Sequence, residues 1–581
     1  MDQKNLFLAI AASIVILLVF QFVMPHAPRP TSPPPAGVQT QAGAPAPAGA
    51  PPVPASGQAS GAPVVPKEVP RIEISGPRVE GSISLLGARI DDVVLRDYHE
   101  TVERGSPLVR LLEPRSDPQP YYIQFGWSAA AGTHIKLPGN DTLWEGSGEV
   151  APGKHATLTW NNGEGQTFEI TIAVDDAYMF SVQQSVRNAS GAPISLYPWS
   201  RIRRDYTPQT LGYYILHEGP VGVLGGTLKE QKYSSVKSDG EKKPDGVAFE
   251  HTGDGGWAGI TDKYWLVALV PNQSAPVTAA FRYIADAGQG GGYQVDFVST
   301  TPQTIPANGQ AMVASQAFAG AKVVHLLDRY ENQDKIPLFS YAVDFGWFWF
   351  LTKPIFYALD WLNGLLGNFG VAIIVFTIFV KALFFPLANK SYRSMSKMKL
   401  LGPKMQVLKE QYKDDPAKLQ QQTMALYRAE KVNPASGCLP MFIQIPVFFS
   451  LYKVIFTTIE MRHAPFFGWI HDLSAVDPTN VFNLFGLIPW DPSQISAWLH
   501  LGIWPLIMGV SMFFQQKMNP PPPDPVQARI FQWMPVMFTF MMGNFPAGLV
   551  IYWTTNNVLT IGQQWLIMRQ TKLDKPRLAR T

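Results

Sequence analysis

A lysine lies inside an apolar stretch in the C-terminal half of the sequence. The run FTIFVKALFFPL, Phe376 to Leu387, places Lys381 between apolar neighbours, in a hydrophobic segment that begins near Leu365. An ionisable side chain at membrane depth costs roughly 2.5 to 3.5 kcal/mol on insertion scales and marks a functional site by default. Lys381 is therefore the first candidate for chemistry, and its role depends on what surrounds it.

Polar side chains in neighbouring apolar segments define those surroundings. Three of them recur at i, i+4 and i+8 in the last predicted span, which places them on one helix face. No aspartate or glutamate occurs inside the five predicted C-terminal spans, so the lysine has no carboxylate partner at membrane depth. Hydrogen bonds between helices explain such residues equally well, but a lysine without a counter-ion favours a water-filled groove. The candidate groove residues are Lys381, Thr377, Gln444, Tyr552, Asn556 and Thr560.

Other motifs that could carry chemistry are weak. Asp91-Asp92 and Asp175-Asp176 have the form of paired carboxylates, but aspartates are common in turns, and we expect turns at both sites. The run GQGGGY at Gly288 lacks the GxGxxG spacing and a following helix, so it indicates a hairpin loop and no phosphate site. We find no nucleotide motif, metal-ligand cluster or nucleophile with a base. The sequence predicts a protein without catalytic residues, metal or cofactor.

The elements that position these residues begin with an apolar N-terminal run. Asn5 to Met24 has roughly the length of 20 residues that crosses a bilayer, and prolines follow it. A secretory signal is the alternative, but its apolar core usually has about 7 to 15 residues and ends at a small-residue cleavage site. We therefore expect residues 1–24 to form an uncleaved transmembrane anchor. Cys438 is the only cysteine, so no internal disulfide framework exists.

Five further apolar segments in the C-terminal part have the length of membrane spans. Together with the anchor they predict an α-helical polytopic membrane protein with six transmembrane helices, in which residues 364–568 form a five-helix core. The near-zero mean hydropathy of the whole chain hides this concentration of apolar residues. The five segments cover residues 365–387, 438–456, 499–518, 530–545 and 549–568.

Lysine and arginine in the loops predict the orientation. Ten of them lie between the second and third spans, and five more lie in a basic tail, residues 569–581. Only Arg462 lies between the third and fourth spans, and the turn NFPAG between the last two has no charge. The positive-inside rule therefore places both termini in the cytoplasm and residues 25–362 outside.

The exported part has three predicted regions. Residues 25–70 are rich in proline, alanine and glycine, which indicates a linker. Apolar residues then alternate, for example after the Asn162-Gly163 turn, which predicts a hairpin and an all-β sandwich over residues 71–335 with a C-terminal helix. Residues 336–363 mix aromatic and charged side chains and indicate an amphipathic segment at the membrane interface. A short crossing is the alternative, and it would invert every later loop against the charge bias.

The loop between the second and third spans is also patterned. Apolar residues from Met398 to Tyr412 recur at spacings of three and four, which indicates one helix face. Asp415 followed by Pro416 predicts the N-cap and first turn of a second helix. Residues 388–435 are thus predicted to form a basic cytoplasmic helical hairpin. Its charges either form a solvated face or contact anionic lipid or ribosomal RNA.

Two separated motifs resemble one known family. KVNPASGCLPMFIQIPVF, Lys431 to Phe448, and MPVMFTFMMGNFPAGLVIYW, Met534 to Trp553, are similar to the signature of the YidC/Oxa/Alb membrane protein insertases. The long exported β region resembles the Gram-negative members, and the likeness extends from the anchor to the tail. The resemblance implies a bacterial inner-membrane protein with a periplasmic β-supersandwich and a hydrophilic groove that is open to lipid and cytoplasm and closed outside.

The resemblance also implies a site. In that family the groove charge is usually arginine, and Lys381 stands at the matching position, where it keeps the charge but loses a bidentate contact. Trp553 stands where tyrosine is frequent, which puts a hydroxyl contact there in question. Client contacts are implied at Ile445, Pro446, Phe448, Tyr552 and Trp553.

The function implied is that of a non-enzymatic insertase and chaperone for inner-membrane proteins, acting alone or with the Sec translocon. Implied partners are nascent membrane proteins, the Sec translocon, the ribosome through the basic hairpin and tail, and membrane lipids, but not DNA. Two other classes remain open. A polytopic solute transporter commonly uses intramembrane carboxylates, which the predicted spans lack. A membrane-anchored periplasmic carbohydrate-active protein would lose its function with its β domain, whereas an insertase would keep most of it.

Overall fold

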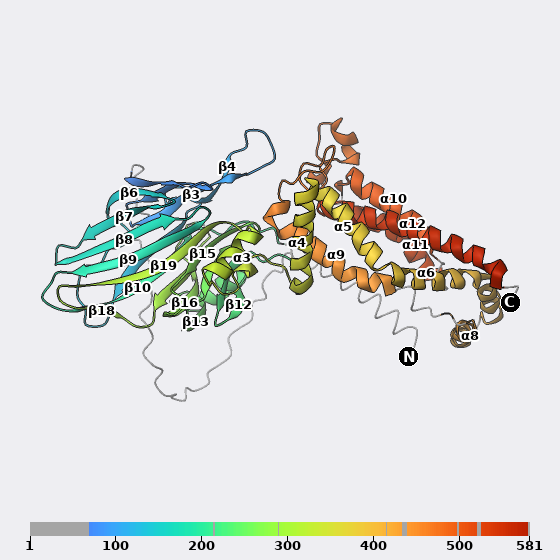
Figure 1. Cartoon of the computed structure of the whole chain (residues 1–581), viewed down its shortest axis with the longest axis horizontal. Coiled ribbons are helices and arrows are strands. Elements are labelled where there is room, and N and C mark those ends of the chain that lie inside the picture. Colours follow the sequence, from blue (N-terminus) through green and yellow to red (C-terminus); the bar gives the residue numbers. More distant parts are fainter. Residues whose placement is uncertain are drawn as a thin grey trace, which may run out of the picture. The chain divides into compact units, whose positions relative to one another are not determined.

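The structure is a computed structural model of the chain. A strand-rich part ends with β19 and is followed by a helical part (Figure 1). The predicted N-terminal anchor and nearly all of the predicted linker lie outside the described residues. The described residues are 69–212, 215–288, 290–413, 415–430, 432, 439–496, 499–519 and 525–578.

The strand-rich part contains nineteen strands within these residues, and one short helix, α2 (Tyr233–Gly240), interrupts them. The strands are β1 (Arg71–Ser75), β2 (Val79–Ser84), β3 (Arg89–His99), β4 (Leu108–Leu112), β5 (Tyr121–Ala129), β6 (Glu145–Ala151), β7 (Lys154–Asn161), β8 (Gln166–Val174), β9 (Met179–Asn188), β10 (Ile194–Arg204), β11 (Gly219–Leu224), β12 (Thr227–Glu230), β13 (Val247–Asp254), β14 (Trp257–Thr261), β15 (Trp265–Val270), β16 (Pro276–Ile284), β17 (Gly292–Ser299), β18 (Gln303–Ile305) and β19 (Gly309–Ala321).

Most strand pairs are antiparallel. One sheet contains β1 to β5, β10, β13 and β16 to β18, and the other contains β6 to β9, β11, β12, β14, β15 and β19. A parallel pairing of Ile74 with Val150 joins β1 to β6. Strands β7 and β8 form the hairpin predicted around Asn162-Gly163, so that prediction is confirmed.

Side chains of both sheets meet in one apolar core. Alternate residues of β8, among them Phe168 and Ile170, are fully buried, as the period-two pattern predicts. The ring of Trp127 on β5 contacts the ring of Phe168 with centroids 5.1 Å apart, so residues of the two sheets pack against each other. An ordinary apolar core thus stabilises this part.

The expected turn at Asp91-Asp92 is wrong, because both residues lie inside β3. There Asp91 is buried and forms an ion pair with Arg71. The expectation holds for Asp175, which follows β8 and accepts a hydrogen bond from the backbone N–H of Ala177 at 2.8 Å. The glycine-rich run at Gly288 connects β16 to β17 in a hairpin, as predicted.

Two helices follow the strands. α3 (Val324–Gln333) is the predicted helix after the β region, and a short 3-10 turn, η1 (Phe339–Ala342), leads to α4 (Trp349–Leu366). α4 buries Phe356 and Leu359 and exposes Trp361, so it is amphipathic.

The predicted span over residues 365–387 is not one helix. α5 (Phe369–Leu383) and α6 (Phe385–Leu400) meet at a bend of 67°. The cause is local: Pro386 has no backbone N–H and its ring excludes the preceding helical turn, so it starts a new helix. The bend places Lys381 in the last turn of α5.

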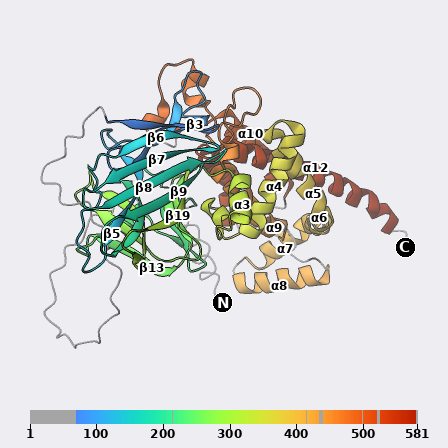
Figure 2. The ribbon, with the colours of Figure 1, turned by 60° about the vertical axis from the view of Figure 1, so that its left-hand side comes forward.

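The basic loop forms a helical hairpin. α7 (Gly402–Gln411) and α8 (Pro416–Ala429) run near each other in Figure 2, and Lys404 pairs with Glu430 at 2.5 Å. Asp415 caps α8 by accepting a hydrogen bond from the backbone N–H of Lys418 at 3.0 Å, which confirms the predicted N-cap. The first predicted helix is divided, because α6 continues to Leu400 and α7 begins two residues later.

The remaining helices are α9 (Leu439–Thr457), α10 (Ile503–Met518), α11 (Pro525–Met542) and α12 (Ala547–Leu578), with 3-10 turns η3 (Ile459–Met461), η4 (Val481–Gly486) and η5 (Pro492–Gln494) between α9 and α10. Within the described residues, no single helix is long and apolar enough to meet a length-and-hydropathy test for a span; the bent pair α5–α6 meets it jointly, and Gln444–Thr457 is a shorter apolar helix. The six predicted crossings stay a prediction.

Candidate substrate groove

Lys381 is held against α12 by polar contacts. Its ammonium donates a hydrogen bond to the hydroxyl of Thr560 at 2.9 Å. That hydroxyl donates in turn to the carbonyl of Asn556 at 2.7 Å, so its lone pairs are free to accept from the lysine. The amide of Gln563 reaches the Lys381 carbonyl at 3.5 Å. Among the described residues, no carboxylate forms an ion pair with Lys381.

The polar line on α12 is longer than the sequence analysis proposed. It continues beyond Thr560 to Gln563 and Gln564, which lie three and four residues farther along the same helix. Within the described part of the chain, the amide oxygens of Asn556, Gln563 and Gln564 are buried without a hydrogen-bond partner. Buried amide oxygens of this kind normally bind protein or water. The i, i+4 spacing extended by one turn predicts Gln564, and the i, i+3 spacing predicts Gln563.

A tyrosine from α6 joins the same line. The hydroxyl of Tyr392 interacts with Thr560 and Gln564, and its ring packs with Ala388 and Ile567. The bend between α5 and α6 allows this contact, because it redirects the chain after Lys381. Sequence reasoning placed this residue in the basic hairpin and gave it no role.

Two predicted groove residues behave differently from each other. Thr377 is buried, and its hydroxyl donates to the carbonyl of Ile373 at 2.6 Å in its own helix, whereas Lys381 donates to Thr560 of α12. Gln444 does reach α12, where its amide donates to the hydroxyl of Tyr552. Of the predicted polar residues, the structure brings Lys381 to Thr560 and Gln444 to Tyr552.

The predicted client contacts on α9 include exposed apolar side chains. Ile445 is exposed, as are Phe442 and Phe449 on the same helix. Phe448 is half-buried and packs edge-on against Trp553 of α12, with ring centroids 4.7 Å apart. Trp553 therefore fills space against the α9 aromatic face, a role that needs no hydroxyl.

Pro446 lies inside α9 and is partly buried. Because proline has no N–H, the backbone carbonyl four residues before it has no helical donor from this position. Such a local break leaves an acceptor on the same helix that carries Gln444 and Ile445.

A second lysine in an apolar helix was missed by the sequence analysis. Lys453 lies within the predicted span 438–456. It forms an ion pair with Asp344 at 2.7 Å and donates to the carbonyl of Ile215 in the strand-rich part. The amino-acid pattern gives no signal for this pair, because Asp344 is distant in the sequence.

Other contacts join the α9–α10 connection to the strand-rich part and α3. The carboxylate of Glu460 accepts a hydrogen bond from the backbone N–H of Val324, at the start of α3, at 2.9 Å. Arg462 donates to the carbonyl of His99 at 2.6 Å, and the hydroxyl of Tyr264 donates to Ser474 at 3.0 Å. Burial raises the pKa of Glu460 to about 7.

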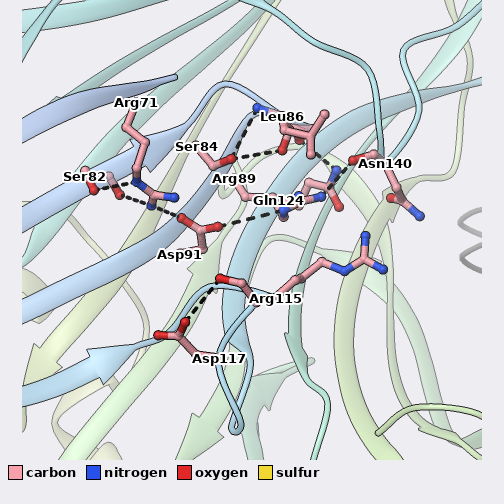
Figure 3. A network of polar contacts seen from close by, with 12 residues as sticks. Arg71, Ser82, Ser84, Leu86, Arg89, Asp91, Arg115, Asp117, Gln124 and Asn140 are labelled. Atoms are coloured by element: carbon pink, nitrogen blue, oxygen red, sulfur yellow. Dashed lines mark hydrogen bonds and ion pairs between the residues drawn. The ribbon is translucent and has the colours of Figure 1, made fainter. Parts of the chain in front are cut away.

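The strand-rich part holds a separate cluster of charges, shown in Figure 3. A cavity of about 210 Å³ lies beside it. Asp91 pairs with Arg71, and Asp92 pairs with Arg110 at 2.9 Å. Arg89 is buried and donates to the carbonyl of Asn140 at 2.8 Å. Both aspartates face guanidinium groups, so the cluster has the chemistry of a structural ion-pair network and lacks an available base.

Two family models match this chain. The model described as 60Kd inner membrane protein matches residues 361–575, and the model described as YidC periplasmic domain matches residues 71–358. A membrane protein insertase YidC of Granulibacter bethesdensis is 60% identical over 583 residues, covering 100% of both chains. One of Acidiphilium cryptum is 57% identical, over 88% of this chain and 86% of the relative. A crystal structure of an active YidC insertase covers 86% of this chain and 92% of its own, with 18% identity and a TM-score of 0.35.

These matches define a class of bacterial inner-membrane protein with a β-rich periplasmic domain and a helical C-terminal region. Within that class, the chain belongs to the YidC family of membrane protein insertases. Its function is the insertion of membrane proteins, a role that is not enzymatic in the named relatives.

Proposed function

We propose that the chain inserts its clients through a polar groove between α5 and α12. The observation that supports this most is the position of Lys381, which is bound to Thr560, has no ion-pair partner among the described residues and lies near amide oxygens without partners. Such a lining binds water and the polar backbone of a client.

The groove acts by shortening the dry path across the bilayer. A polar tail loses the water bound to its backbone inside hydrocarbon, and each unsatisfied group costs several kcal/mol. A wet groove that reaches part of the way across removes part of that barrier. The ammonium of Lys381 attracts an acidic tail, and no bond is made or broken in the protein.

Client hydrophobic segments leave along α9. Ile445 and Phe448 form the proposed exit surface, with Pro446, Tyr552 and Trp553 beside it. The sequence of α11 adds methionines, whose flexible thioethers adapt to varied side chains.

The proposed topology has six spans, with both termini in the cytoplasm and the β domain in the periplasm as a supersandwich. The domain bounds are those predicted: anchor 1–24, linker 25–70, β domain 71–335, interfacial segment 336–363 and core 364–568. The basic hairpin, residues 388–435, and the tail, residues 569–581, face the cytoplasm. We include the ribosome and the Sec translocon as partners, and the charge of the hairpin and tail supports the ribosome.

Site-specific photocrosslinking to a stalled nascent membrane protein tests the exit surface. We expect probes at Ile445 and Phe448 to crosslink to the client transmembrane segment. A probe at Val510, an exposed apolar residue of α10, is the matched control and should reach lipid only. Crosslinks from Ile445 and Phe448 to lipid alone, with client bound, would contradict the exit path.

Deletion of the basic hairpin tests its role in docking. Removal of residues 390–430 should abolish insertion while the purified protein keeps its periplasmic domain and membrane helices folded. Normal insertion by that deletion variant, measured in cells depleted of the native protein, would show that the hairpin is not needed.

A further inference from the structure

The connection between α9 and α10 presents an apolar tip. We call Phe482 to Trp490 the outer loop tip. All of its residues except Asn483 are exposed, and Leu487 has 83% of its surface accessible. From Pro478 to Trp490 the sequence contains no charged residue. A contiguous exposed apolar surface of this kind marks an interaction site.

The base of this loop is fixed, in contrast to its tip. Asp477 is buried, and its carboxylate accepts hydrogen bonds from the indole N–H of Trp469 at 3.0 Å and from the backbone N–H of Trp504 at 2.9 Å. The hydroxyl of Thr479 accepts from the backbone N–H of Ile503 at 3.0 Å. These bonds cap the N-terminus of α10, so the loop leaves that helix end in a defined direction.

The same base is tied to α12. The backbone N–H of Ala547 donates to the carbonyl of Ala475 at 2.7 Å, and that of Gly548 donates to the carbonyl of Leu473 at 2.9 Å. The loop therefore starts from the N-terminal ends of two helices, and under the proposed topology both ends lie at the periplasmic surface of the bilayer.

Hydrogen bonds within the loop satisfy several of the backbone polar groups of the tip. The N–H of Phe485 donates to the carbonyl of Asn480 at 2.9 Å, and the N–H of Ile488 donates to the carbonyl of Asn483 at 3.1 Å. The side chain of Asn483 accepts from the N–H of Gly486 at 2.9 Å. Internal hydrogen bonding is what a segment needs before it can leave water for an apolar phase.

Two adjacent residues of the tip adopt an uncommon backbone conformation. Leu484 and Phe485 have φ of 50° and 60°, in the left-handed region that favours glycine. Bulky side chains persist there only when the surroundings impose it, and such positions cluster at functional sites. Here the conformation turns both apolar side chains outward, since both are exposed.

We propose that the outer loop tip inserts into the headgroup and acyl boundary of the periplasmic leaflet. The helix at the base of the loop, α10, also exposes apolar side chains, Ile507, Val510 and Phe514, which supports this placement. Trp490 is the last residue of the tip, and tryptophan is enriched at the membrane interface. This inference rests on the proposed topology, because the orientation of α10 and α12 decides which leaflet the tip meets.

A reporter in the tip tests the inference directly. Cys438→Ser removes the only cysteine, and Leu487→Cys or Leu484→Cys then carries an environment-sensitive NBD label. The full-length protein is reconstituted in vesicles of phosphatidylethanolamine and phosphatidylglycerol. Met312→Cys is the matched control, because Met312 is an exposed apolar residue on β19 of the periplasmic domain.

We expect a blue-shifted emission for both tip labels, with several-fold more quenching by a lipid-borne spin label than by aqueous iodide. The Met312 label should show the reverse. Equal, water-like emission from tip and control would overturn the proposal. So would a blue shift that appears only at high protein density, which indicates a second copy, or only with nascent chains, which indicates client binding. Dithionite does not cross the bilayer, so it reduces only the NBD labels on the side to which it is added. Under the proposed topology the tip labels and the Met312 label lie on the same side, so the same fraction of each should be reduced. A tip in the wrong leaflet would give a different fraction, which separates that case from a failed insertion.

Discussion

The two lysines in apolar helices differ in what they face. Lys453, near the C-terminal end of α9, has its charge neutralised by Asp344 and also donates a hydrogen bond to a backbone carbonyl. Lys381, in the last turn of α5, is bound by a neutral hydroxyl. A paired charge holds two parts of the fold together, whereas a charge held by a neutral group still attracts an anion. The first arrangement suits structure, and the second suits transient binding.

The largest expected effect on insertion comes from the lysine that has no ion-pair partner among the described residues, Lys381. Lys381→Leu should reduce insertion of a two-span client with aspartates in its translocated loop about tenfold, which corresponds to about 1.4 kcal/mol of lost attraction. Lys381→Arg should retain insertion activity. Lys381→Glu should reduce insertion of this client most, because the glutamate repels the acidic translocated loop. Protease protection in cells depleted of the native protein measures insertion.

The matched client carries asparagines in place of the aspartates, and its insertion should fall less. Lys517→Leu is the matched lysine control, because Lys517 lies in the last turn of α10 with its ammonium 4.5 Å from the ring centroid of Phe513 in the same helix. If the Lys381→Leu variant inserts both clients equally, Lys381 has no electrostatic role and serves only to hydrate or anchor the helix.

The second effect concerns pH at the contact between α3 and the α9–α10 connection. Burial raises the pKa of Glu460 from 4.5 to about 7, so the folded protein holds a proton that the unfolded chain releases. The free energy of unfolding should therefore fall by about 3 kcal/mol in all as pH rises from about 4.5 to about 7, and it should stay low above pH 7.

Glu460→Gln should remove this pH dependence, and the variant should unfold at a higher temperature than the native protein at pH 8. Thermal unfolding in detergent at pH 5 and pH 8 measures both. Parallel curves for the two proteins would contradict the protonated state.

The third effect is the loss of one partner of the paired lysine. Lys453→Met leaves Asp344 without its cation, and breaking a fully buried pair costs about 3 to 5 kcal/mol. Both side chains are slightly exposed, so we expect about 2 kcal/mol, seen as a lower unfolding temperature. Adding Asp344→Asn should recover part of the loss. A double variant that is as unstable as the sum of the single changes would mean that the two residues do not interact.

Local signals in the sequence predicted local structure well. The Asp415-Pro416 pair predicted a cap, and the i, i+4 spacing on α12 predicted the polar line that meets Lys381. The bend after α5 had a signal in Pro386, but the length of the apolar run outweighed it. The ion pair of Lys453 with Asp344 had no signal in the sequence, because tertiary contacts between distant segments leave no periodic pattern in one sequence.

The smallest effect should come from the charge network of the β domain. Arg110 pairs with Asp92 and Asp117, each at 2.9 Å, but its side chain is 40% exposed. Water and salt screen such pairs, and exposed pairs usually contribute about 0.2 to 1 kcal/mol. Arg110→Ala should therefore lower the unfolding temperature only slightly at low salt and not at all in concentrated sodium chloride. Insertion should be unchanged. A loss of insertion in Arg110→Ala with unchanged stability would mean that this network binds a ligand or partner. The charges of the β domain would then not be purely structural, and their contrast with the client-binding charge of Lys381 would be wrong.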